Sequence, residues 1–329
     1  FTWERDGFKA KDASLRLTVS VQGDHIGHFR EFLHIPEGWQ RDFSAMRSRN
    51  EMLAAIAEAF WLPLALAALA LLVQGLRRRR IPWRPVLAIS AGIGAMAILS
   101  QLNMIPLLVD AFPTSSPYLQ TLALVILEAL GAGVGVFVYI VIPAAAGEPG
   151  YRERTGDRLS LRTLLTPSGL GSRAFYRAVI VGYAFAALHL AFIVAFYLVG
   201  RRFGVWSPQD VQYSNLLSTA LPLIYPIALA SMAAASEEFW FRLLAIPLLE
   251  RLLKLRWLAV VIPAFVWGFL HANYPQQPAY IRGVEVGVIG VAAGFLMLRY
   301  GIAATLVWHF TVDAGLMGGF LFESPSWYF

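Results

Sequence analysis

Residues 216–249 read LLSTALPLIYPIALASMAAASEEFWFRLLAIPLL. Three charged side chains, Glu237, Glu238 and Arg242, interrupt a stretch that is otherwise uncharged and mostly apolar. About 20 apolar residues in a helix cross the roughly 30 Å of hydrocarbon in a bilayer, so the stretch is long enough to span a membrane. A charged side chain at the bilayer centre costs about 3 kcal/mol even on insertion scales, and intramembrane charges therefore mark functional sites. The stretch predicts a membrane-embedded site whose partners lie on other helices.

The composition of the whole chain indicates the same fold class. Of its 329 residues, 57% are hydrophobic and 15% are charged, which excludes an ordinary soluble domain. In lipid, an open sheet cannot satisfy its backbone hydrogen bonds, so the apolar segments are interpreted as helices. We predict an all-α polytopic membrane protein with about eight transmembrane helices, at residues 52–76, 85–109, 119–146, 174–200, 216–235, 257–271, 284–298 and 302–321.

Residues 1–50 differ in kind from the rest of the chain. They are polar, and the alternation Leu15-Arg-Leu-Thr-Val-Ser-Val21 predicts a strand, followed by a turn at Gly23-Asp24. We interpret residues 1–50 as a small extramembrane segment, the remnant of a larger N-terminal domain. Residues 51–329 then form the transmembrane helical domain.

Arginines gather between the predicted spans and account for the net charge of +6. Four of them, at 77–80, directly follow the first span. By the positive-inside rule this loop is cytoplasmic, which places residues 1–50 outside the membrane. Topology explains the basic charge, and nucleic-acid binding is not expected. Cysteine is absent, which excludes disulfides, a thiolate nucleophile and thiolate metal ligands.

Helical geometry assigns different tasks to the two glutamates. Neighbouring residues diverge by about 100° around a helix, so Glu237 and Glu238 are not expected to point at one target. Glu238 precedes Arg242 by four residues, the favourable order for an ion pair. That pairing leaves Glu237 as the acid that is free to act as a general base.

Prolines and glycines predict local features of the helices. Prolines at 222, 226 and 247 lie on both sides of the glutamates and predict a kinked or broken helix. Small-residue spacings that permit close helix contacts occur at Gly131/Gly135, Gly283/Gly287, Gly290/Gly294 and Gly315/Gly319.

Candidate partners for Glu237 lie in two later spans. His271 ends one apolar segment, and His309 and Asp313 are four residues apart on one face of the last span. Other polar residues in the spans stand singly and are interpreted as interhelical hydrogen-bond partners or cavity lining: Gln101, Asn103, Glu128, His189 and Glu285.

Two chemistries fit one acid, two histidines and a second acid. Glu237 and His271 could activate a water that attacks a peptide carbonyl, while His309 stabilises the oxyanion. Alternatively, a divalent metal such as zinc is held by some of Glu237, His271, His309 and Asp313. A third hypothesis, from another class, is a non-catalytic scaffold or ion transporter that uses the same polar cavity. Spacing alone leaves all three open, since neither His-Glu-x-x-His nor Gly-x-Ser-x-Gly occurs.

Taken together, three motifs resemble a known family. Glu-Glu-x-x-x-Arg at 237–242, a histidine after aromatic residues at 271 and His-x-x-x-Asp at 309–313 follow one another in late spans. This order resembles the CAAX prenyl protease type II and bacteriocin-processing family of intramembrane glutamic endopeptidases. The resemblance covers about residues 174–322.

The resemblance implies a role for each matched residue. Glu237 would be the water-activating base with His271 as its partner, and His309 with Asp313 would bind the oxyanion. Glu238, Arg242 and Asn273 would be supporting residues. A glutamic protease needs no cofactor, and the implied partners are a membrane-associated protein or peptide substrate and the lipid bilayer, with the bacterial inner membrane as the expected location.

The chain departs from the family pattern at two positions. Trp267 stands four residues before His271, where phenylalanine is common. Asp313 ends the third motif, where asparagine is frequent. A carboxyl group donates a hydrogen bond to an oxyanion only when it is protonated, so Asp313 could instead orient His309, or bind a metal.

Overall fold

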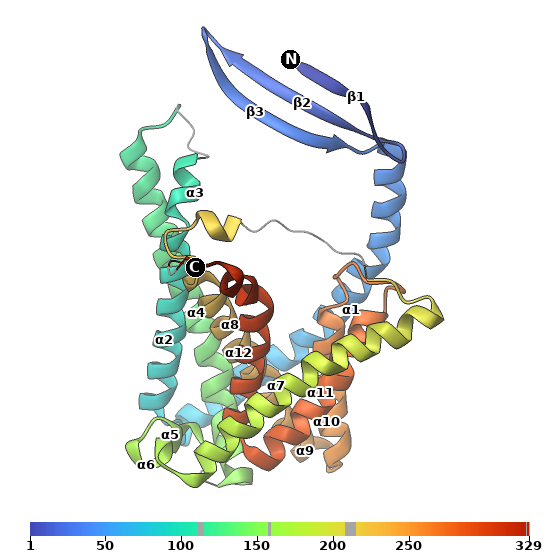
Figure 1. The fold of residues 1–329 in the computed structure, drawn as a ribbon. Coiled ribbons are helices and arrows are strands. Elements are labelled where there is room, and N and C mark those ends of the chain that lie inside the picture. The colour runs from blue at the N-terminus through green and yellow to red at the C-terminus, as the bar shows by residue number, and fades with distance from the viewer. Residues whose placement is uncertain (111–114, 157–158, 208–214, 327, 329) are drawn as a thin grey trace. The chain divides into compact units, whose positions relative to one another are not determined.

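The computed structural model describes residues 1–110, 115–156, 159–207, 215–326 and 328 (Figure 1). The chain divides into two compact units, Phe1–Met52 and Leu53–Phe329. The first unit contains a small sheet, and the second contains helices.

The N-terminal unit is built on three antiparallel strands in the order β1-β2-β3. They span Thr2–Ala10 (β1), Ala13–Gln22 (β2) and His25–His34 (β3). The predicted strand at 15–21 is confirmed as part of β2, because its alternating side chains suit the two faces of a pleated strand. The predicted turn is confirmed as well: Gly23, with φ of +64°, reverses the chain between β2 and β3.

Six helices among the described residues are long and apolar enough to cross a membrane. These spans are Glu37–Arg77 (α1), Trp83–Leu108, Tyr118–Thr155 (α4), Arg173–Phe203, Ile281–Tyr300 (α11) and Ile302–Glu323. Three of these spans contain more than one element. The span that begins at Trp83 contains α2 (Trp83–Asn103) and most of α3 (Ile105–Asp110). The span that begins at Arg173 contains α7 (Arg173–Gly200) and a 3₁₀ turn, and the span that begins at Ile302 contains α12 (Ile302–Gly318) and a 3₁₀ turn. Two short helices, α5 (Leu161–Leu164) and α6 (Pro167–Leu170), lie between α4 and α7. The polytopic helical fold is thus confirmed.

The predicted count of eight spans is not reached, for two identifiable reasons. The span expected at 216–235 is divided between a 3₁₀ turn at Asn215–Ser218 (η3) and α8 (Ile224–Glu237). The span expected at 257–271 is α10 (Arg256–Leu270), which has only 15 residues. Both segments contain helix, but neither forms one long apolar helix.

The charged stretch changes helix type instead of ending. After α8, residues Glu238–Ala245 (η4) form a π-helix, and Ile246–Leu253 (α9) continue as α-helix. π-helical turns inside α-helices are rare and frequently accompany functional sites. The break expected from the prolines lies between η3 and α8, around Pro222, and the π-helix that begins at Glu238 is a separate feature.

Glycines set how closely the helices around η4 approach. A Cβ at Gly268 of α10 would lie 2.5 Å from the backbone of both Gly283 and Gly287 of α11, so only glycine fits there. The predicted close packing at 283/287 and 290/294 is confirmed, because all four glycines of α11 face atoms of α10. It is wrong for Gly131/Gly135 and Gly315/Gly319, where a Cβ would meet open space.

Candidate active site

The ion pair expected between Glu238 and Arg242 is present. Nη1 of Arg242 donates to Oε1 of Glu238 over 3.0 Å, and the two side chains are 0% and 1% exposed. All eight residues of η4 are buried, and the π-helix packs against α4, α10 and α12. Buried charges persist only where they are paired, so this pair lets η4 carry two charges through the core.

His309 contacts both glutamates, which corrects the expectation from α-helical geometry. Its Nδ1 lies 2.9 Å from Oε1 of Glu238, and its Nε2 lies 3.7 Å from Oε2 of Glu237. The expectation fails because an imidazole presents two nitrogens on different edges, so one ring faces two acids that point in different directions. One histidine of α12 therefore links the two acids.

Glu237 is the accessible acid of the pair. Its side chain is 28% exposed, whereas that of Glu238 is fully buried. Oε2 of Glu237 accepts a hydrogen bond from Nε1 of Trp267 and lies 3.8 Å from Nε2 of His271. This distance exceeds a direct hydrogen bond, so both groups remain available to a water molecule.

His271 is oriented by the end of its own helix. It follows the last residue of α10, and its Nδ1 lies 2.9 Å from the backbone oxygen of Trp267. A carbonyl oxygen can only accept, so Nδ1 carries the hydrogen of this contact. In the neutral ring Nε2 is then the acceptor, and it is the nitrogen that faces Glu237.

Trp267 has a role in the site that its sequence position did not reveal. Besides donating to Glu237, its ring lies under the guanidinium of Arg242, with Cζ 4.0 Å from the ring centroid. Such a cation–π contact is stronger when it is buried, as it is here. The only available signal was the position of this aromatic residue one helical turn before His271.

The remaining predicted residues occupy two different settings. Asp313 lies with Oδ2 3.5 Å from Nε2 of His309 and is partly exposed, so it joins the cluster. Asn273 lies in the exposed turn after α10. The structure thus brings together the four candidate catalytic side chains, Glu237, His271, His309 and Asp313.

A second polar cluster lies on α7 and α11. It confirms the interpretation of His189 and Glu285 as hydrogen-bond partners between helices, although the two residues do not stand singly. Nε2 of His189 is 3.9 Å from Oε1 of Glu285, and the other carboxylate oxygen, Oε2, pairs with Arg282 and accepts from Tyr197 over 3.4 Å. Nε1 of Trp308 donates to Nδ1 of His189 over 3.3 Å. Only the three-residue spacing of Arg282 and Glu285 could have suggested this cluster.

The other polar residues of the spans divide between two environments. Asn103 binds the backbone of Leu221 through both ends of its amide, at 2.6 and 3.0 Å, which confirms a role as a hydrogen-bond partner between segments. Gln101 and Glu128 are exposed on the surface of the helical unit. For them, a cavity-lining role is wrong.

Metal binding was tested against the arrangement of the donors. In the part of the chain that the structure describes, no group of three or more histidine, aspartate or glutamate side chains is arranged to hold a metal ion. One imidazole nitrogen of each candidate histidine is already engaged, by Glu238 in His309 and by the Trp267 carbonyl in His271.

Six long apolar helices among the described residues indicate an integral membrane protein, and its candidate site is the cluster of carboxylate and imidazole groups around Glu237. Residues 216–315, which contain every side chain of that cluster, match the family model for Rce1-like type II CAAX prenyl endopeptidases. The match confirms the resemblance predicted from the three motifs: over this segment the chain is similar to type II CAAX prenyl endopeptidases.

Part of the chain is also similar to one curated protein. The sporulation-killing factor biosynthesis protein SkfC of Bacillus subtilis (strain 168) is 27% identical to this chain over 78 residues. The aligned stretch covers 24% of this chain and 16% of the relative. No solved structure matches the chain.

Proposed function

We propose that the protein is an intramembrane endopeptidase in which Glu237 and His271 activate water for attack on a peptide bond. The observation that carries the proposal is the convergence of Glu237, His271 and His309, from three different helices, with separations of 3.7 and 3.8 Å from Oε2 of Glu237. The family match over residues 216–315 supports a peptide as the substrate.

Glu237 acts as the general base in this mechanism. A water held by Oε2 of Glu237 and Nε2 of His271 gives its proton to the carboxylate as its oxygen bonds to the carbonyl carbon. The carbonyl π electrons move to the oxygen, which becomes an oxyanion. Glu237 then returns the proton to the amide nitrogen as the C–N bond breaks, so that a carboxylic acid and an amine leave.

His309 supplies the positive electrostatics for the oxyanion. Its Nδ1 bonds to the carboxylate of Glu238, which accepts and therefore leaves the hydrogen on Nδ1. Nε2 donates to the oxyanion when the ring is doubly protonated. Three carboxylates, those of Glu237, Glu238 and Asp313, lie within 3.7 Å of this ring and stabilise such a cation.

Asp313 acts through His309 in this scheme. At 3.5 Å from Nε2 it holds the imidazole on the side that faces Glu237. A carboxylate in this place orients the histidine without contacting the substrate, so we assign Asp313 as a positioning residue.

The experiment that tests the function compares Glu237→Gln with Glu128→Gln in proteoliposomes, using a library of membrane-anchored fluorogenic peptides as the probe. Loss of a general base lowers turnover by about 10²–10⁴-fold, while the exposed Glu128 serves as the matched control. Cleavage by Glu237→Gln at the rate of the unaltered protein would overturn the proposal.

A further inference from the structure

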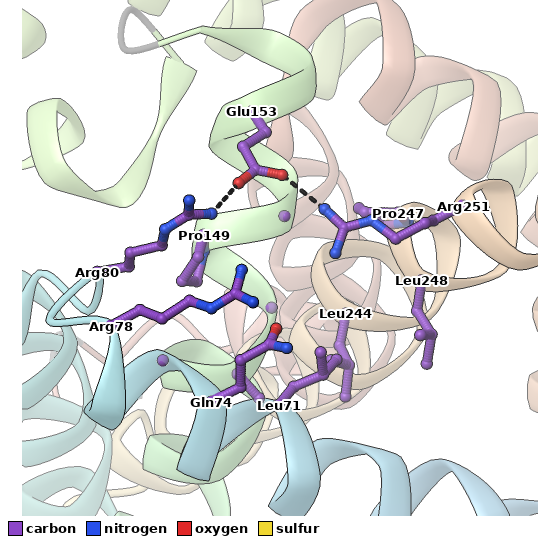
Figure 2. A pocket seen from close by; sticks show the side chains of 14 residues that line it. Leu71, Gln74, Arg78, Arg80, Pro149, Glu153, Leu244, Pro247, Leu248 and Arg251 are labelled. Atoms are coloured by element: carbon purple, nitrogen blue, oxygen red, sulfur yellow. Dashed lines mark hydrogen bonds and ion pairs between the residues drawn. The ribbon is translucent and has the colours of Figure 1, made fainter.

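A cleft with basic walls opens between the arginine-rich end of α1, the C-terminal half of α4 and the segment that joins η4 to α9 (Figure 2). Its lining includes Leu71 and Gln74 of α1, Arg78 just after that helix, Glu153 of α4, and Pro247 and Arg251 of α9. We name it the arginine cleft. None of the four candidate catalytic side chains lines it, so it is a separate feature from the site of Glu237.

The arginine cleft is lined by more positive than negative side chains. Glu153 is held between Nη1 of Arg80 at 2.5 Å and Nη2 of Arg251 at 2.6 Å, as the dashed lines in Figure 2 show. Arg78 reaches into the same space, and among the described residues no carboxylate forms an ion pair with it. Three guanidinium groups therefore face one carboxylate, which leaves the cleft positive.

The floor of the arginine cleft is apolar. In Figure 2, Leu71 of α1, Leu244 of η4 and Leu248 of α9 lie below the arginines, and Pro247 lies beside Arg251. A small soluble anion would bind the arginines and leave the apolar side chains exposed to water. A molecule with an anionic head and a hydrocarbon tail would cover both surfaces.

We propose that the arginine cleft binds the phosphate head group of an anionic membrane phospholipid, with an acyl chain against the leucines. Guanidinium groups bind phosphate through paired, charge-assisted hydrogen bonds. Basic pockets between transmembrane helices on the cytoplasmic side are where anionic lipid head groups bind, and each surface arginine contributes to that attraction. The cleft lies next to the arginine run at 77–80, which the positive-inside rule places on that side.

The proposal is tested on the full-length protein in detergent, titrated with phosphatidylglycerol or with phosphatidylcholine of the same acyl chains, and with bound lipid counted by native mass spectrometry. The unaltered protein is expected to bind phosphatidylglycerol more tightly. Arg78→Gln should weaken that binding about fivefold. Its neighbour Arg77, which does not line the cleft, provides a control with the same change of net charge, and Arg77→Gln should bind as the unaltered protein does.

Glu153→Gln gives an expected change of the opposite sign, because it removes the negative charge between Arg80 and Arg251. Tighter binding by Glu153→Gln cannot result from damage to the fold. The proposal is overturned if Arg78→Gln and Arg77→Gln weaken binding equally, if the two lipids bind equally, or if inorganic phosphate binds as tightly as phosphatidylglycerol. The lipid-binding proposal does not depend on the proposed protease function, and either proposal can be overturned while the other stands.

Discussion

Nδ1 of His309 lies 2.9 Å from Oε1 of Glu238, and the same oxygen accepts a hydrogen bond from Nη1 of Arg242 over 3.0 Å. A cation and a histidine therefore share one buried oxygen. This arrangement ties α12 to the π-helix and sets the edge of the imidazole that faces Glu237. The supporting ion pair and the candidate catalytic cluster are one connected network.

The buried ion pair makes a stability prediction. Arg242→Met removes the countercharge of Glu238 and leaves an unpaired buried carboxylate, a change that costs about 3–5 kcal/mol. We expect the free energy of unfolding in mixed detergent micelles to fall by that amount. Arg256→Met is the control, because Arg256 pairs with Glu250 at 3.2 Å on the surface and such pairs contribute about 0–1 kcal/mol. Equal losses in the two variants would contradict the buried role.

Two substitutions of Trp267 separate its hydrogen bond to Glu237 from its cation–π contact with Arg242. Trp267→Phe keeps an aromatic ring under Arg242 but removes the Nε1–H that donates to Glu237. We expect cleavage within about tenfold of the unaltered protein, because the cost is that of one hydrogen bond, about 1 kcal/mol. Trp267→Ala also opens a cavity and should lower the unfolding free energy by about 3–5 kcal/mol. A phenylalanine variant as unstable as the alanine variant would be inconsistent with this division.

The variant Asp313→Asn tests whether Asp313 positions His309 or binds a metal ion. Asp313→Asn preserves the shape of the side chain and its contact with His309, so kcat is expected to stay within about tenfold and KM to stay unchanged. Addition of a chelator is expected to leave cleavage unaltered. A metal-dependent enzyme would instead lose cleavage with the chelator, regain it with zinc, and lose affinity for zinc in Asp313→Asn.

The orientation in the membrane can be measured directly because the chain contains no cysteine. We expect a cysteine introduced by Asp24→Cys, in the turn between β2 and β3, to react with an impermeant maleimide in intact cells. Arg77→Cys, at the end of α1, should react only after the membrane is permeabilised. The reverse pattern would place residues 1–50 in the cytoplasm.

Local patterns predicted much of this protein correctly. Hydropathy is a property of each segment, and it predicted a helical membrane protein and the strand at 15–21. The four-residue spacing predicted the pair of Glu238 and Arg242 because that contact lies within one turn of a single helix. The three motifs predicted the family that matches residues 216–315.

These local patterns did not predict the contacts between helices. The approach of His309 to both glutamates depends on the packing of α12 against α8 and η4, which the period of a single helix does not predict. The hydrogen bond from Trp267 and the meeting of His189 with Glu285 join segments far apart in the chain.

The sequence by itself determined which segments are helical and apolar, and which side chains among them carry acid–base chemistry. The tertiary structure alone decided that these side chains meet, because the packing of α12 against α8 and of α10 against η4 brings Glu237, His271 and His309 together. The physical reason is that hydropathy and helical period act over one or two turns. The depth and rotation of one helix against another follow from the fit of all their side chains at once.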